Sequence, residues 1–86
     1  MTAKELIENA SDKALILEPQ STFNHALIGV TTDGRLVYSE DKILVALQDI
    51  EGMTYEEALD YYGYNTVRSL AYGKATVTPV IIAHSR

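Results

Sequence analysis

Residues 54–72, TYEEALDYYGYNTVRSLAY, contain most of the side chains in this 86-residue chain whose types and spacing could do chemistry. They include five of the six tyrosines and one of only three arginines. An amide, a guanidinium, a hydroxyl and a phenol recur at the helical spacing i, i+3, i+4 and i+7, at Asn65, Arg68, Ser69 and Tyr72. Because tyrosine and arginine are enriched among the residues that dominate protein interfaces, this polar stripe is a candidate recognition surface.

Acidic residues precede the stripe. Glu56, Glu57 and Asp60 lie off the apolar positions of the expected helix, and we expect Tyr61 and Tyr64 to complete the partner-binding surface with them. Residues 40–60 hold seven acidic residues against one lysine, a local charge of −6 in a chain whose net charge is −5. A one-sided acidic surface favours a basic protein partner and accelerates the encounter with it.

Two plainer interpretations of the same residues stay open. A run of charges is often only a solvated helix face that keeps a small protein in solution. Asn65 serves equally well as a helix cap, and Arg68 can pair internally with Asp60 or Glu57. The stripe and the acids therefore indicate a surface without identifying its ligand.

The sequence motifs of catalysis are missing. There is no phosphate-binding loop, no dinucleotide fingerprint, no HExxH and no nucleophile elbow. The chain has no cysteine, and its two histidines, His25 and His84, come without a positioned carboxylate, so a metal site is not expected. We expect a protein that is not an enzyme and that needs no cofactor.

Charge and hydropathy exclude two further classes of partner. Direct binding of nucleic acid requires a basic footprint for the phosphates, which this acidic chain lacks. The longest apolar runs, Ile43–Leu47 and Val80–Ala83, are too short to cross a bilayer, and the first residues do not form a secretory signal. We therefore expect a cytoplasmic protein that binds neither nucleic acid nor membrane.

The candidate surface requires a helix, a tight break and a second short helix. Thr54 and Glu57 have the spacing of a capping box, and the spacing of Tyr55, Ala58, Leu59 and Tyr62 predicts the core face of the first helix. Gly63 is expected to end that helix in a left-handed conformation. Asn65 or Thr66 would then cap the second helix, and Gly73 would end it.

Local signals predict the elements that hold this helix pair. Thr2 and Glu5 predict a capped helix, the apolar run Ala14–Leu17 a covered strand, and residues 18–22 a loop. Residues 26–38 predict a hairpin that turns at Thr32-Asp33-Gly34, with a bulge or a close backbone approach at Gly29.

The next segments complete the scaffold. Ser39 is expected to cap a helix over Glu40–Ile50 that buries Ile43, Leu44, Ala46, Leu47 and Ile50. Thr76–Ala83 is expected to return as a strand that begins near Pro79 or lies at an edge. The sequence thus predicts one α+β domain over residues 1–86, a small, mostly antiparallel sheet with helices packed on one face, in the order α-β-β-β-α-α-α-β.

Three stretches carry a resemblance to a known family: GVTTDGRLVY at 29–38, GMTYEEALDYYGYNTVRSL at 52–70 and PVII at 79–82. They resemble a family of small uncharacterised acidic proteins from Gram-positive bacteria and their phages and mobile elements. Its members share the hairpin, a GM[ST]xEEA helix, a YNT[VI]R segment and a P[VI]II strand. The resemblance implies an accessory gene of a phage or mobile element, and its motifs would carry over onto Tyr64, Asn65, Thr66 and Arg68.

These observations favour a non-enzymatic regulatory protein that binds another protein through an acidic helical face. Inhibition of a host or defence protein would fit the genomic setting that the resemblance implies. The alternative is a small-ligand module or small enzyme that holds an anion with Tyr64, Asn65, Arg68 and Tyr72. Because a domain of this size gains much from added buried area, we also expect a homodimer that forms through a strand edge or an apolar helix face.

Overall fold

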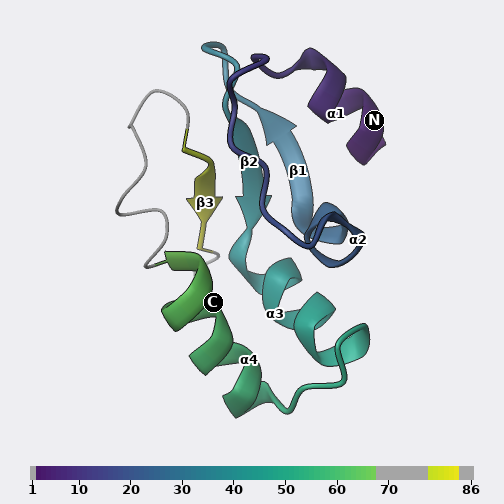
Figure 1. Cartoon of the computed structure of the whole chain (residues 1–86), viewed down its shortest axis with the longest axis vertical. Coiled ribbons are helices and arrows are strands. Elements are labelled where there is room, and N and C mark those ends of the chain that lie inside the picture. The colour runs from purple at the N-terminus through teal and green to yellow at the C-terminus, as the bar shows by residue number, and fades with distance from the viewer. Residues whose placement is uncertain (1, 68–77, 84–86) are drawn as a thin grey trace.

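The computed structural model describes residues 2–67 and 78–83, and of residues 65–67 only the backbone (Figure 1). Its elements are α1 (Ala3–Asn9), α2 (Gln20–Phe23), the 3₁₀ turn η1 (Asn24–Ala26), β1 (Leu27–Val30), β2 (Leu36–Ser39), α3 (Glu40–Asp49), α4 (Tyr55–Tyr61), the π-helical stretch η2 (Tyr62–Val67) and β3 (Val80–Ile82). In Figure 1, α1 lies beside β1, while α3 and α4 extend beyond one end of the sheet. The predicted α+β class is confirmed.

The sheet has the order β1-β2-β3 and is mixed. β1 pairs with β2 in the antiparallel sense, whereas β2 pairs with β3 in the parallel sense. The expectation of a mostly antiparallel sheet is corrected in this respect. Parallel neighbours need a long crossover connection, and the chain from β2 through α3 and α4 supplies one.

The hairpin forms as the sequence predicts. Gly34 takes a φ of +87°, which a side chain would disfavour, and its carbonyl accepts a hydrogen bond from the backbone N–H of Ser11 at 2.9 Å. The register shifts between Leu27 and Gly29, and a Cβ atom at Gly29 would meet only Val37 at an ordinary 3.8 Å, so of the two expected alternatives the structure favours the bulge. Gly34 thus closes the turn and also lets the end of α1 approach it.

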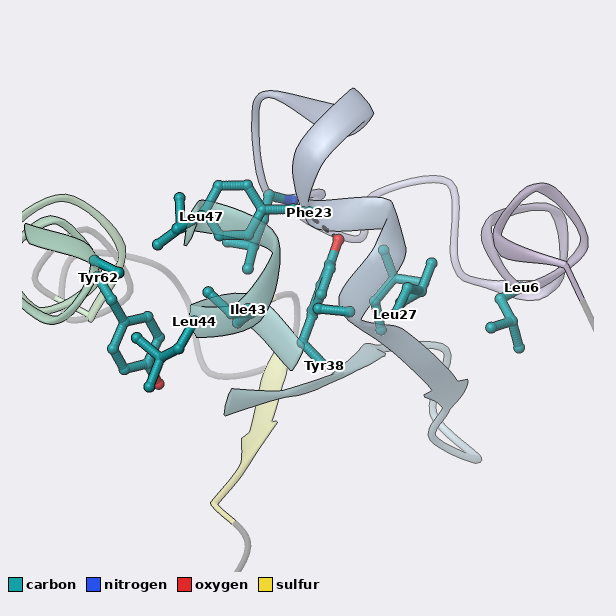
Figure 2. Close-up of a cluster of buried hydrophobic side chains, with 12 residues drawn as sticks. Leu6, Phe23, Leu27, Tyr38, Ile43, Leu44, Leu47 and Tyr62 are labelled. Carbon is teal, nitrogen blue, oxygen red and sulfur yellow. Dashed lines mark hydrogen bonds between the residues drawn. The ribbon is translucent and has the colours of Figure 1, made fainter. Parts of the chain in front are cut away.

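The strand predicted over Ala14–Leu17 is wrong. These residues form no strand, and Leu17 instead donates its backbone N–H to the phenolic oxygen of Tyr38 at 3.1 Å. Figure 2 shows the Tyr38 side chain projecting from the sheet, so Leu17, which is bonded to its phenolic oxygen, lies over the face of the sheet and not along its edge. The loop predicted over residues 18–22 is also wrong in part, because α2 begins at Gln20, directly after Pro19.

Alternate residues of the strands face the core. The register pairs Leu27 with Tyr38 and Val30 with Leu36, which places these four side chains on one face of the sheet. Figure 2 shows the helical side chains that meet this face in one cluster, among them Leu6, Phe23, Ile43, Leu44 and Leu47. Because they share this cluster, α1, α2 and α3 contribute side chains to one face of the sheet, as predicted, whereas α4 packs against α3 beyond the end of the sheet.

Side-chain caps fix where α1 and α3 begin. Thr2 and Glu5 form the predicted capping box, and the Ser39 hydroxyl accepts a hydrogen bond from the backbone N–H of Lys42 at 3.3 Å. The expected burial of Ile50 is wrong, because this side chain is 46% exposed. Ile50 follows the last residue of α3, where the helix projects beyond the sheet (Figure 1).

Candidate functional site

Helix α4 begins at a fully formed capping box. The Thr54 hydroxyl accepts a hydrogen bond from the backbone N–H of Glu57 at 3.1 Å, and the Glu57 carboxylate accepts one from the backbone N–H of Thr54 at 2.9 Å. These bonds satisfy two of the donors that a helix start leaves open. The bond from the Thr54 backbone also holds the pKa of the Glu57 carboxyl below its usual value. Glu57 is therefore a structural residue as well as a surface charge.

A narrow row of side chains anchors α4 to the body of the protein. Ala58 is fully buried and Tyr62 is 8% exposed, and the two lie four residues apart on one side of the helix. The Tyr62 hydroxyl donates a hydrogen bond to the Glu40 carboxylate at the start of α3, at 3.0 Å. Burial, followed by this contact with Glu40, raises the pKa of the Tyr62 phenol. Figure 2 shows the ring reaching from α4 to the side of Leu44.

The rest of the core face predicted for α4 is exposed. Tyr55 and Leu59 were expected to be buried, but they are 55% and 40% exposed. The helix contacts α3 along the row of Ala58 and Tyr62, and residues one step around the helix fall outside that contact. The expectation is corrected here, and the correction adds two apolar side chains to the surface of α4.

Acidic residues lie beside these two apolar side chains. Glu56 and Asp60 are exposed, and each follows Tyr55 or Leu59 directly in the sequence. Tyr55 and Leu59 have the spacing i, i+4, and so do Glu56 and Asp60. An apolar row and an acidic row therefore run next to each other along α4. We call the surface of Tyr55, Glu56, Leu59 and Asp60 the α4 face. It can offer ring contact and two carboxylates to a basic side chain at once.

The predicted break at Gly63 does not occur. Gly63 has no positive φ, and the backbone continues from α4 into η2, a π-helical stretch that includes Asn65 and Thr66. The two residues expected to cap a second helix therefore lie inside a helical stretch. The change of winding lies at Tyr62, where η2 begins; the backbone N–H of this residue is shared between the carbonyls of Ala58 and Leu59.

The remaining predicted site residues divide into two groups. Tyr61 is half-buried against the core, and Tyr64 is 70% exposed beyond the end of α4. Arg68, Ser69 and Tyr72 lie outside the described residues, as do Gly73, His84 and the side chain of Asn65. The predicted polar stripe, the internal pairing of Arg68 and the anion site therefore fall outside the described part of the chain.

The described residues form neither a metal-ligating cluster nor a membrane-spanning helix. Within residues 2–67 and 78–83, no three His, Asp or Glu side chains gather closely enough to hold a metal ion. His25 is exposed on η1, beside α3. Over the same residues, no helix combines the length and apolar character needed to cross a bilayer.

Comparisons with known proteins identified no relative of this chain. No protein-family model matches the sequence, and searches of curated proteins and of solved structures found no match.

Proposed function

We propose that this protein is a non-enzymatic regulatory protein that binds a partner with a basic surface through the α4 face. The observation that carries the proposal is the exposure of Tyr55 and Leu59 directly beside Glu56 and Asp60. A group of large apolar side chains that is exposed to solvent typically marks the centre of a protein interface. Charges around such a group steer the partner and set specificity.

Different residues of α4 hold the fold and face the solvent, and this separation supports the proposal. Ala58 and Tyr62 fix the helix to α3, so the neighbouring rows of the α4 face need no further role in holding the fold. A tyrosine ring supplies contact area at low entropic cost, because it has few rotatable bonds. Lysine or arginine of a partner can cover the Tyr55 ring and pair with Glu56 or Asp60 in one contact.

The resemblance to small proteins of phages and mobile elements suggests what kind of partner this is. In such a setting, the partner is a protein of the host or of its defence, and the bound accessory protein inhibits it. A basic surface that normally holds nucleic acid would accept the acidic row of α4 in its place. The proposal thus includes occlusion of a nucleic-acid site by a protein that does not itself bind nucleic acid.

Photo-crosslinking from the α4 face tests the proposal. A benzophenone amino acid is introduced at Tyr55 in one bait and at Lys13, an exposed residue on the segment after α1, in a control bait. Both baits are irradiated in lysate of the host. We expect a discrete adduct from position 55, absent from position 13, with a protein whose surface is basic. Equal labelling from both positions, or labelling from neither, would contradict the proposal.

A further inference from the structure

A second surface of the molecule, on α3, lies apart from the α4 face. A shallow groove of about 300 Å³ runs between η1 and α3 and is lined by His25, Lys42, Val45, Ala46, Asp49 and Ile50. Val45 is 53% and Ile50 46% exposed, so large apolar side chains stand open to solvent here. None of the residues that line this groove belongs to the α4 face.

The two ends of this side of α3 carry opposite charges. Lys42 and Asp49 are both exposed and are seven residues apart, so they share one side of the helix, separated by about 10 Å along its axis. Val45, which is 53% exposed, and Ala46, which lines the groove although it is only 4% exposed, lie midway between them. One end of the stripe is therefore positive, the middle is apolar and the other end is negative.

Such a stripe is complementary to its own copy when two helices run antiparallel. A two-fold axis between Val45 and Ala46 places Lys42 of each copy opposite Asp49 of the other. The same axis places Val45 of each copy opposite Ala46 of the other at the centre. We propose that this stripe of α3, Lys42, Val45, Ala46 and Asp49, is a docking surface for a second copy of the chain.

Charge complementarity favours a second copy over other occupants. A basic partner would meet Lys42, and an acidic partner would meet Asp49, whereas an antiparallel copy pairs both charges. A contact confined to one helix face buries less than the roughly 1,200–2,000 Å² of a standard interface. The dimer is accordingly weak, with a dissociation constant on the order of 100 µM.

Reversing one charge at a time tests the arrangement. Lys42→Asp places two aspartates opposite each other at both ends of the contact, and Asp49→Lys places two lysines there. Both changes suit the dipole of α3, since Lys42 lies in its first turn and Asp49 at its end, so folding is expected to survive. Sedimentation equilibrium over a concentration series is the measurement.

The mixture of the two variants is the decisive sample. We expect wild type to dimerise, each single variant to associate at least tenfold more weakly, and an equimolar mixture to recover the dimer. In the mixture, one chain carries two aspartates and the other two lysines, so both cross-pairs are again attractive. A monomeric wild type, single variants that dimerise like wild type, or a mixture that stays monomeric would each overturn the proposal.

Discussion

The Tyr62 hydroxyl donates its hydrogen bond to the Glu40 carboxylate across 3.0 Å and so joins the end of α4 to the start of α3. These residues are 22 positions apart in the sequence and come from different helices. Together with the buried Ala58, this bond sets the orientation of α4. The direction in which Tyr55 and Leu59 face therefore depends on it.

Removing the Tyr62 hydroxyl should destabilise the protein. Hydrogen bonds to charged groups contribute about 1.5–3 kcal/mol, and partial exposure of the Glu40 side chain lowers this to about 1–2 kcal/mol. We expect Tyr62→Phe to lower the melting temperature by roughly 4–15 °C. Tyr55→Phe is the matched control, because Tyr55 is 55% exposed, and its effect should stay within about 0.5 kcal/mol. Equal effects of the two variants would contradict this account of Tyr62.

The phenolic oxygen of Tyr38 should contribute to the stability of the protein, in addition to its buried ring. Its side chain is fully buried, and its phenolic oxygen accepts the backbone N–H of Leu17. Tyr38→Phe leaves that N–H without its partner inside the protein, which costs about 1–3 kcal/mol. We expect a lower urea midpoint together with faster hydrogen exchange at the Leu17 amide. Unchanged exchange at Leu17 would show that the phenol does not hold this segment.

Two glycines should respond in opposite directions to alanine. At Gly34 a Cβ atom would lie 2.9 Å from the backbone nitrogen of Ser11, in a residue whose φ is +87°. We expect Gly34→Ala to cost about 2 kcal/mol or more. At Gly63 a Cβ atom would meet nothing within 4 Å, and the φ is not positive. Gly63→Ala should therefore be neutral or stabilise the fold by up to about 1 kcal/mol. Urea denaturation measures both, and a reversed order would contradict the geometry.

The sequence signals that predicted the fold correctly are local ones. The turn glycine Gly34 and the caps Thr2, Ser39 and Thr54 each act through contacts within a few residues, so their spacing is visible in the sequence. The parallel pairing of β3 could not be read in this way. It depends on where the crossover through α3 and α4 returns the chain.

Two errors have the same physical origin. The apolar run Ala14–Leu17 was expected to be a strand, but apolar residues only require cover, and the phenol of Tyr38 satisfies the Leu17 amide without a ladder. The apolar spacing of α4 marked Tyr55 and Leu59 as core, but the width of the contact with α3 decides how many rows are buried. The width of a contact between two helices depends on how they pack and cannot be predicted from the spacing of apolar residues in one helix.

The capping box of α4 should make stability depend on pH. The pKa of Glu57 is lowered in the folded state by its hydrogen bonds with Thr54, so the ionised carboxylate favours folding. This contribution is fully present above the ordinary pKa of 4.5 and is lost as the pH falls through the lowered folded-state pKa. Glu57→Gln keeps an acceptor oxygen but no charge. We expect wild type to melt above this variant at neutral pH, with the difference vanishing in acid.

A neighbouring glutamate provides the control for this pH dependence. Glu56 is exposed on the same helix turn but does not belong to the capping box. Glu56→Gln should therefore leave most of the pH dependence of wild type in place. A difference between wild type and Glu57→Gln that persists unchanged into acid would contradict the role of the charged cap.

The role of the α4 face in binding is the central claim, and a titration of the crosslinked partner with two charge-reversed proteins tests it most directly. One variant carries Glu56→Lys and Asp60→Lys on the α4 face. The other carries Glu8→Lys and Asp12→Lys, two exposed acids near the N-terminus, and so has the same net charge. Glu57 is left unchanged because it caps the helix. We expect the α4 variant to bind at least about tenfold more weakly, with the difference shrinking as salt rises, and the control variant to stay within about threefold of wild type. Equal weakening of both variants, or of neither, would contradict the claim.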